Sequence, residues 1–145
     1  MEQHYSIRQN RLWVVSNYVI LLFFLGLFYL GKELAWPQSI IAVEVILFIL
    51  FLVSFRRAFL LTNFWKMVHS SKNRLDEREM QVVLNALKNS YVIFTIVCLL
   101  IIYGFAVAEK GPVNVIIAAG LLYLAHTLPA AVVGWHEKMY ILNYD

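Results

Sequence analysis

The sequence predicts an all-α integral membrane protein, built as a four-helix bundle. Of its 145 residues 61% are hydrophobic and only 14% are charged, whereas soluble domains are about 45–50% apolar. Four apolar stretches, at about 12–31, 37–55, 91–108 and 112–135, each approach the roughly 20 residues that a helix needs to cross a bilayer. None alternates with a period of two, which favours helices over a barrel.

The orientation follows from the basic residues. Ten of the twelve Lys and Arg residues lie in the N-terminal tail, the segment 56–90 or the C-terminal tail, and only Lys32 and Lys110 lie on the other side. Because cytoplasmic loops carry the excess of positive charge, both termini and the central segment are predicted to be cytoplasmic, N-in and C-in. An aromatic belt is then expected at Trp13, Trp65 and Trp135 on the inner side and at Trp36 on the outer side.

The first stretch is expected to remain as a span, because the polar start with Glu2 and the long apolar run do not resemble a cleavable signal. The turn 31–37 leads into the second span. The turn 109–112 is so short that spans three and four must be antiparallel neighbours. Pro37 and Pro112 each suit the first turn of the helix that follows. The cysteine at position 98, in the third span, is interpreted as a buried apolar side chain.

The cytoplasmic segment 56–90 is predicted to be helical. Arg56 and Arg57, followed by apolar residues, indicate that span two continues as an amphipathic interfacial helix. A break is expected at 70–73. Asp76 with Glu79 three residues later has the spacing of a capping box, so a helix should begin there and run into span three.

This long helix carries an apolar stripe at Leu75, Met80, Val83 and Leu87. The simplest interpretation is that the stripe packs on the preceding cytoplasmic helix, and the alternative is a partner protein or a second copy. The cytoplasmic interaction surface would then include Arg74, Asp76, Glu77, Arg78 and Glu79. The same residues can equally form a solvated helix face.

The run from Arg74 to Glu79, ahead of a membrane helix, resembles the Leu-Asp-Glu-Arg-Glu element of several small, uncharacterised prokaryotic membrane proteins. The resemblance covers six residues and the topology. It implies a prokaryotic cytoplasmic membrane as the location, and no particular chemistry.

Two ionisable residues fall inside the predicted spans, where charge is costly. Glu44 has apolar neighbours along its helix, so a protonated side chain bonded to another helix is expected. Tyr29 and Tyr103 are its candidate partners. His126 lies deeper, on a stripe of small residues that is expected to face protein. The helix-packing residues predicted with it are Ala119, Ala130 and Gly134 in span four, and Gly104 and Ala108 in span three.

These residues leave two functional alternatives open. Glu44 and His126 could pass a proton or a cation, and four short spans with an embedded glutamate are similar in outline to the small multidrug-resistance transporters. Those proteins, however, have the acid in the first span and only short loops. A haem-binding subunit is the second alternative, and it would need His69 and His136 to converge.

The favoured interpretation is a non-catalytic accessory, assembly or regulatory subunit of the cell membrane. The sequence lacks the usual nucleophile, zinc-hydrolase and phosphate-loop motifs and has no nucleic-acid fingerprint. No enzyme activity, metal or cofactor is therefore expected. The expected partners are the lipid bilayer and other membrane proteins or further copies of the chain.

Overall fold

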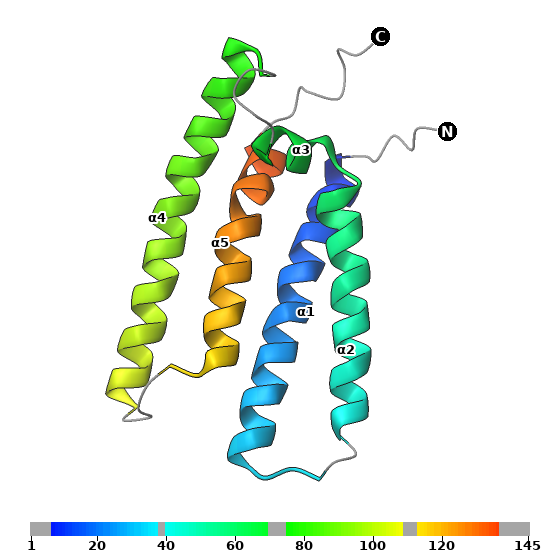
Figure 1. The fold of residues 1–145 in the computed structure, drawn as a ribbon, viewed down its shortest axis with the longest axis vertical. Helices are drawn as coiled ribbons and strands as arrows, with labels where there is room; N and C mark the ends of the chain where they lie inside the picture. The colour runs from blue at the N-terminus through cyan, green and yellow to red at the C-terminus, as the bar shows by residue number, and fades with distance from the viewer. Residues whose placement is uncertain (1–6, 38–39, 70–74, 109–112, 137–145) are drawn as a thin grey trace. The chain divides into compact units, whose positions relative to one another are not determined.

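The computed structural model describes residues 7–37, 40–69, 75–108 and 113–136, and all of their regular elements are helical. The chain divides into two compact units, residues 1–62 and 63–145. In the first unit α1 (Ile7–Glu33) and α2 (Ile40–Phe55) form an antiparallel hairpin (Figure 1). The second unit contains the short α3 (Asn63–His69) and the antiparallel pair α4 (Glu77–Val107) and α5 (Val115–His136).

Within the described residues, three helices are long and apolar enough to cross a membrane: α1 over Gln9–Glu33, α4 over Glu77–Val107 and α5 over Val115–Trp135. The all-helical prediction is thus confirmed, and three of the predicted spans coincide with such helices. The second span is shorter than predicted, because α2 has 16 residues and begins at Ile40 rather than at Pro37.

The start of α2 is delayed because Pro37 belongs to the turn. The Trp36 N–H donates to the Gly31 carbonyl at 3.0 Å, and Ala35 has the left-handed φ of 47° that often ends a helix. The Ile40 N–H then donates to the Pro37 carbonyl. The start predicted at Pro112 lies outside the described residues, and α5 begins at Val115 with Asn114 Oδ1 accepting from the Ile116 N–H.

The helix of span two continues, as predicted, but as one π-helical turn. This turn, η1 (Arg56–Leu60), ends where the Leu61 N–H donates to the Arg56 carbonyl. Its Phe59 is 1% exposed and packs edge-on against Tyr18 of α1. Instead of one interfacial helix, the chain therefore has η1 in the first unit and α3 in the second.

The predicted capping box at the start of α4 is confirmed. The Glu77 N–H donates to Asp76 Oδ1 at 2.7 Å, and the Asp76 N–H donates to Glu79 Oε2 at 3.1 Å. These bonds satisfy donors that the first turn of a helix would otherwise leave free. The break expected at 70–73 lies outside the described residues.

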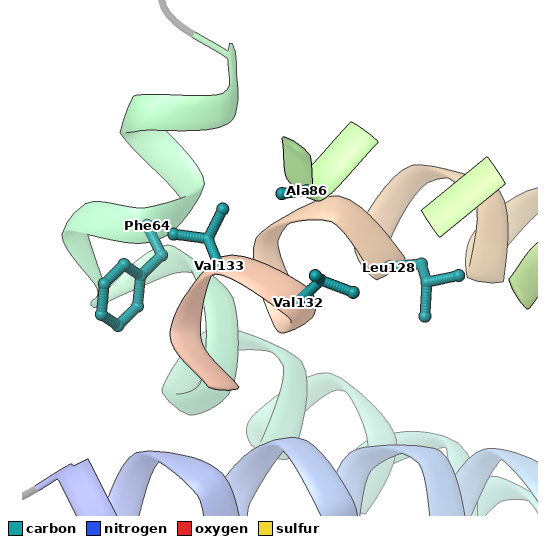
Figure 2. Packing of buried hydrophobic residues seen from close by; sticks show 5 residues of the cluster. All are labelled: Phe64, Ala86, Leu128, Val132 and Val133. Atoms are coloured by element: carbon teal, nitrogen blue, oxygen red, sulfur yellow. The ribbon is translucent and has the colours of Figure 1, made fainter. Parts of the chain in front are cut away.

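The core of the second unit lies between α3, α4 and α5. Figure 2 shows its five central side chains, which are Phe64, Ala86, Leu128, Val132 and Val133. The buried face of α4 is formed by Val83, Ala86 and Ser90, whereas Leu87 of the predicted stripe is 44% exposed. The buried face of α4 therefore includes the small residues Ala86 and Ser90 in place of Leu87, because a small side chain such as Ala86 allows the helices to approach closely.

Candidate functional site

The most chemically distinctive site lies between α3 and α5, where two histidines and a tryptophan gather. The ring centroids of His69 and His126 are 4.8 Å apart. Trp65 stacks on His69 at 4.0 Å and meets His126 edge-on at 5.2 Å. Trp65 and His69 are four residues apart and therefore share one face of α3.

The position of α3 depends on the apolar core beside the histidines. Phe64 is 9% exposed and lies in one cluster with Val133 of α5, which is 1% exposed (Figure 2). The neighbouring Trp65 therefore lies over α5, together with His69 one turn later. The site thus follows from how α3 packs, which the spacing of histidines along the sequence does not reveal.

The orientation of the His69 ring is set by a backbone group. His69 Nδ1 lies 2.9 Å from the Trp65 carbonyl oxygen. Because a carbonyl oxygen can only accept, Nδ1 carries the hydrogen and donates it. In the neutral ring Nε2 then keeps its lone pair and can bind a proton or a metal ion.

The site lies at the edge of the packed region. His69 and His126 are both exposed, whereas the residues of α5 from 127 to 134 are all buried. His126 is therefore reachable from outside this core and is not enclosed within it. Among the described residues no three His, Cys, Asp or Glu side chains gather as a metal cluster would require.

The haem alternative named His69 with His136, but the His136 side chain lies outside the described residues. The structure instead pairs His69 with His126. Rings whose centroids are 4.8 Å apart leave no room for a porphyrin between them. This pair therefore does not form a bis-histidine haem site.

Glu44 lies in the second turn of α2, opposite the end of α1. Its Oε1 is 3.8 Å from the point where a Cβ on Gly31 would lie, and Trp36 Cε3 is 3.7 Å from that point. About 6 Å of helix precedes Glu44, so it lies nearer the hairpin turn than the predicted span implied. Of its candidate partners, Tyr29 is half-buried in α1, and Tyr103 belongs to the second unit and is 67% exposed.

The predicted packing residues fall into two groups. Ala130 and Gly134 are buried in α5. Ala119, Gly104 and Ala108 are exposed, and a Cβ added at Gly104 would meet nothing within 4 Å. Gly104 and Ala108 therefore do not pack within their own unit.

The charged surface at the start of α4 is largely solvated. Asp76, Glu77 and Arg78 are exposed, and Asp76 and Glu79 are engaged in the capping box. Arg74 lies outside the described residues.

Sequence reasoning missed one polar cluster. Asn17 is fully buried, and its amide donates to Ser54 Oγ at 2.8 Å and to the Phe51 carbonyl at 3.3 Å. The sequence does contain a sign of this cluster, since the polar Asn17 interrupts the first apolar stretch.

No protein-family model, curated protein or solved structure matches the chain.

Proposed function

We propose that the chain is a four-span, N-in and C-in subunit of a prokaryotic cytoplasmic membrane, without catalysis of its own. It would act as an accessory, assembly or regulatory subunit that binds a transmembrane helix of another protein or of a second copy. The three membrane-length helices support the location. The distribution of Lys and Arg supports the orientation.

The fourth span would be α2, which η1 continues at the cytoplasmic interface. These elements contain 16 and 5 residues and follow one another without a gap, which is within the range of roughly 17–25 residues for a membrane helix. At the end of this run the guanidinium carbon of Arg57 lies 5.6 Å from the ring centroid of Trp13. A cation paired with an aromatic ring suits the inner membrane interface.

The absence of a conducting or catalytic role is supported by the polar side chains of the described spans. Asn17 and Ser54 bond to each other and to a backbone carbonyl. Thr95 and Thr127 each donate to the carbonyl four residues earlier. These four side chains are satisfied locally. Among the described residues the buried Asn10 Oδ1 and Ser90 Oγ have no hydrogen-bond partner, and these two atoms lie in different units.

The observation that carries the binding role is the part of α4 around Tyr103, Gly104 and Ala108, which is not covered within the second unit. Tyr103 is 67% exposed, open space surrounds the missing side chain of Gly104, and Ala108 is also exposed. Small residues allow a second helix to approach the backbone, and the tyrosine hydroxyl can bond across such a contact.

The test is extraction of the tagged chain from its native membrane in a mild detergent, followed by native mass spectrometry. The proposal predicts an assembly heavier than one chain. A second polypeptide would identify a subunit, and a multiple of the chain mass would identify self-association. A monomer alone, in detergents that preserve known complexes of that membrane, would contradict the proposal.

A proton-coupled transporter is the second candidate, because Glu44 and the paired His126 are ionisable groups within predicted spans. It requires Glu44→Gln to abolish proton-coupled flux in reconstituted vesicles while the fold is retained. Unchanged flux would remove Glu44 from any transport mechanism. The subunit proposal predicts that this substitution leaves the purified assembly intact.

A further inference from the structure

We propose that His69 and His126 bind one divalent transition-metal ion, such as Zn²⁺, Cu²⁺ or Ni²⁺, and that the ion fastens α3 to α5. This inference does not depend on the proposed subunit role. It rests on the distance between the rings, the orientation of His69 and the exposure of both side chains.

The distance between the rings suits two ligands on adjacent corners of a metal site. Imidazole nitrogen binds Zn²⁺ at about 2.0–2.1 Å, which puts the ring centroid roughly 3.2 Å from the ion. Two such rings at a tetrahedral angle have centroids about 5 Å apart, and two on opposite sides of the ion about 6.4 Å apart. The observed separation is 4.8 Å, close to the adjacent arrangement, and the two rings are in edge contact with 61° between their planes.

His69 makes the kind of second-nitrogen hydrogen bond that metal-binding histidines make. Histidines that bind metals usually donate their second ring N–H to a carbonyl or carboxylate, which fixes the ring and the tautomer. The Trp65 carbonyl accepts that bond from Nδ1 at 2.9 Å. The Trp65 ring, stacked at 4.0 Å, further limits rotation of the His69 imidazole. Nε2 is then the nitrogen available to the ion.

Among the described residues no third protein ligand gathers, so the remaining coordination positions are left to ligands from outside the chain. Imidazole ligands favour zinc, copper and nickel over magnesium and calcium. Since the two ligands come from different helices, the bound ion would join α3 to α5 in addition to the Phe64 and Val133 packing. Metal binding should therefore also protect the backbone amides of α3 from exchange.

The test uses the full chain in mild detergent, with an affinity tag that contains no histidine, after removal of metals by a chelator. Calorimetric titration with Zn²⁺ and with Cu²⁺ should show one ion per chain. His69→Gln and His126→Gln should each weaken binding at least about tenfold, because changes in outer-shell partners alone cost 10–100-fold. His4→Gln removes a histidine from the N-terminal segment and should change nothing. Trp65→Phe should still bind one ion per chain.

Electron paramagnetic resonance of the Cu²⁺-loaded wild-type chain keeps the test decisive even if a histidine variant folds poorly. The proposal predicts hyperfine coupling to two imidazole nitrogens. In a separate fluorescence measurement, Cu²⁺ should quench tryptophan emission more strongly in the wild-type chain than in Trp65→Phe. Coupling to one imidazole or none would overturn it. Equal loss of affinity in His4→Gln, or full affinity in His69→Gln or His126→Gln, would also overturn it.

Discussion

The Asn17 amide of α1 donates a 2.8 Å hydrogen bond to Ser54 Oγ of α2, and both side chains are almost completely buried. Ser54 Oγ in turn donates to the Phe51 carbonyl at 2.9 Å. The bond thus joins the two helices of the first unit just before the π-helical turn.

Asn17→Ala should destabilise this hairpin by about 1–2 kcal/mol, because it removes a hydrogen bond between helices and leaves a cavity. Ser54→Ala should cost less, because the Asn17 amide can still donate to the Phe51 carbonyl. Reversible unfolding in mixed micelles gives the free energy of unfolding of both single variants and of the double variant. The single effects should not add, since both remove the same bond. Additive effects would show that the bond contributes nothing.

The docking of α3 depends on the contact between Phe64 and α5. Phe64→Ala removes a side chain whose truncation typically costs about 3–5 kcal/mol, so amide exchange in α3 should accelerate at least about tenfold. Val133→Ala, from the facing helix, should have the same effect to a smaller extent. Leu122→Ala is the control, because Leu122 is 73% exposed. Unchanged exchange in Phe64→Ala would disprove this contact.

The start of α4 should be sensitive to its capping box. Asp76→Ala should cost about 0.5–2 kcal/mol of helix stability and fray the first turn, because it removes the Asp76 Oδ1 acceptor of the Glu77 N–H. Hydrogen exchange at residues 77–80 measures the fraying. Glu77→Gln, which keeps Asp76 and Glu79, is the matched control. Equal fraying in both variants would assign the effect to charge rather than to the cap.

The turn after α1 offers a stabilising substitution. Ala35 has a φ of 47°, where a Cβ is strained. Ala35→Gly should therefore raise the stability of the first unit by about 0.5–1 kcal/mol. Ala42→Gly, at an exposed position inside α2, should lower it by a similar amount. Thermal unfolding of the two variants should show opposite shifts, and a loss of stability in Ala35→Gly would contradict the turn geometry.

Features that depend on local sequence could be predicted. The start of α4 follows from Asp76 and Glu79, and the membrane-length helices follow from apolar length alone. The start of α2 was misplaced because Pro37 also suits the residues after a helix, and only the Gly31 to Trp36 bond decides between the two roles.

Features that depend on packing could not be predicted. The pairing of His69 with His126 requires knowing which face of α3 meets α5, and that is decided by Phe64 and its neighbours. For the same reason the buried stripe of α4 centres on Ala86 and not on the larger Leu87. Asn17 was visible in the sequence, but its partner on α2 was not.

The proposed subunit role requires that α4 binds another transmembrane helix around Tyr103, Gly104 and Ala108. A photoreactive amino acid placed at position 103 and activated in native membranes detects such a helix, with the same group at the buried Val133 as the control. We expect a cross-linked product heavier than the chain from position 103 and none from position 133. Adducts with lipid alone at position 103, under conditions that cross-link a known complex, would disprove the contact.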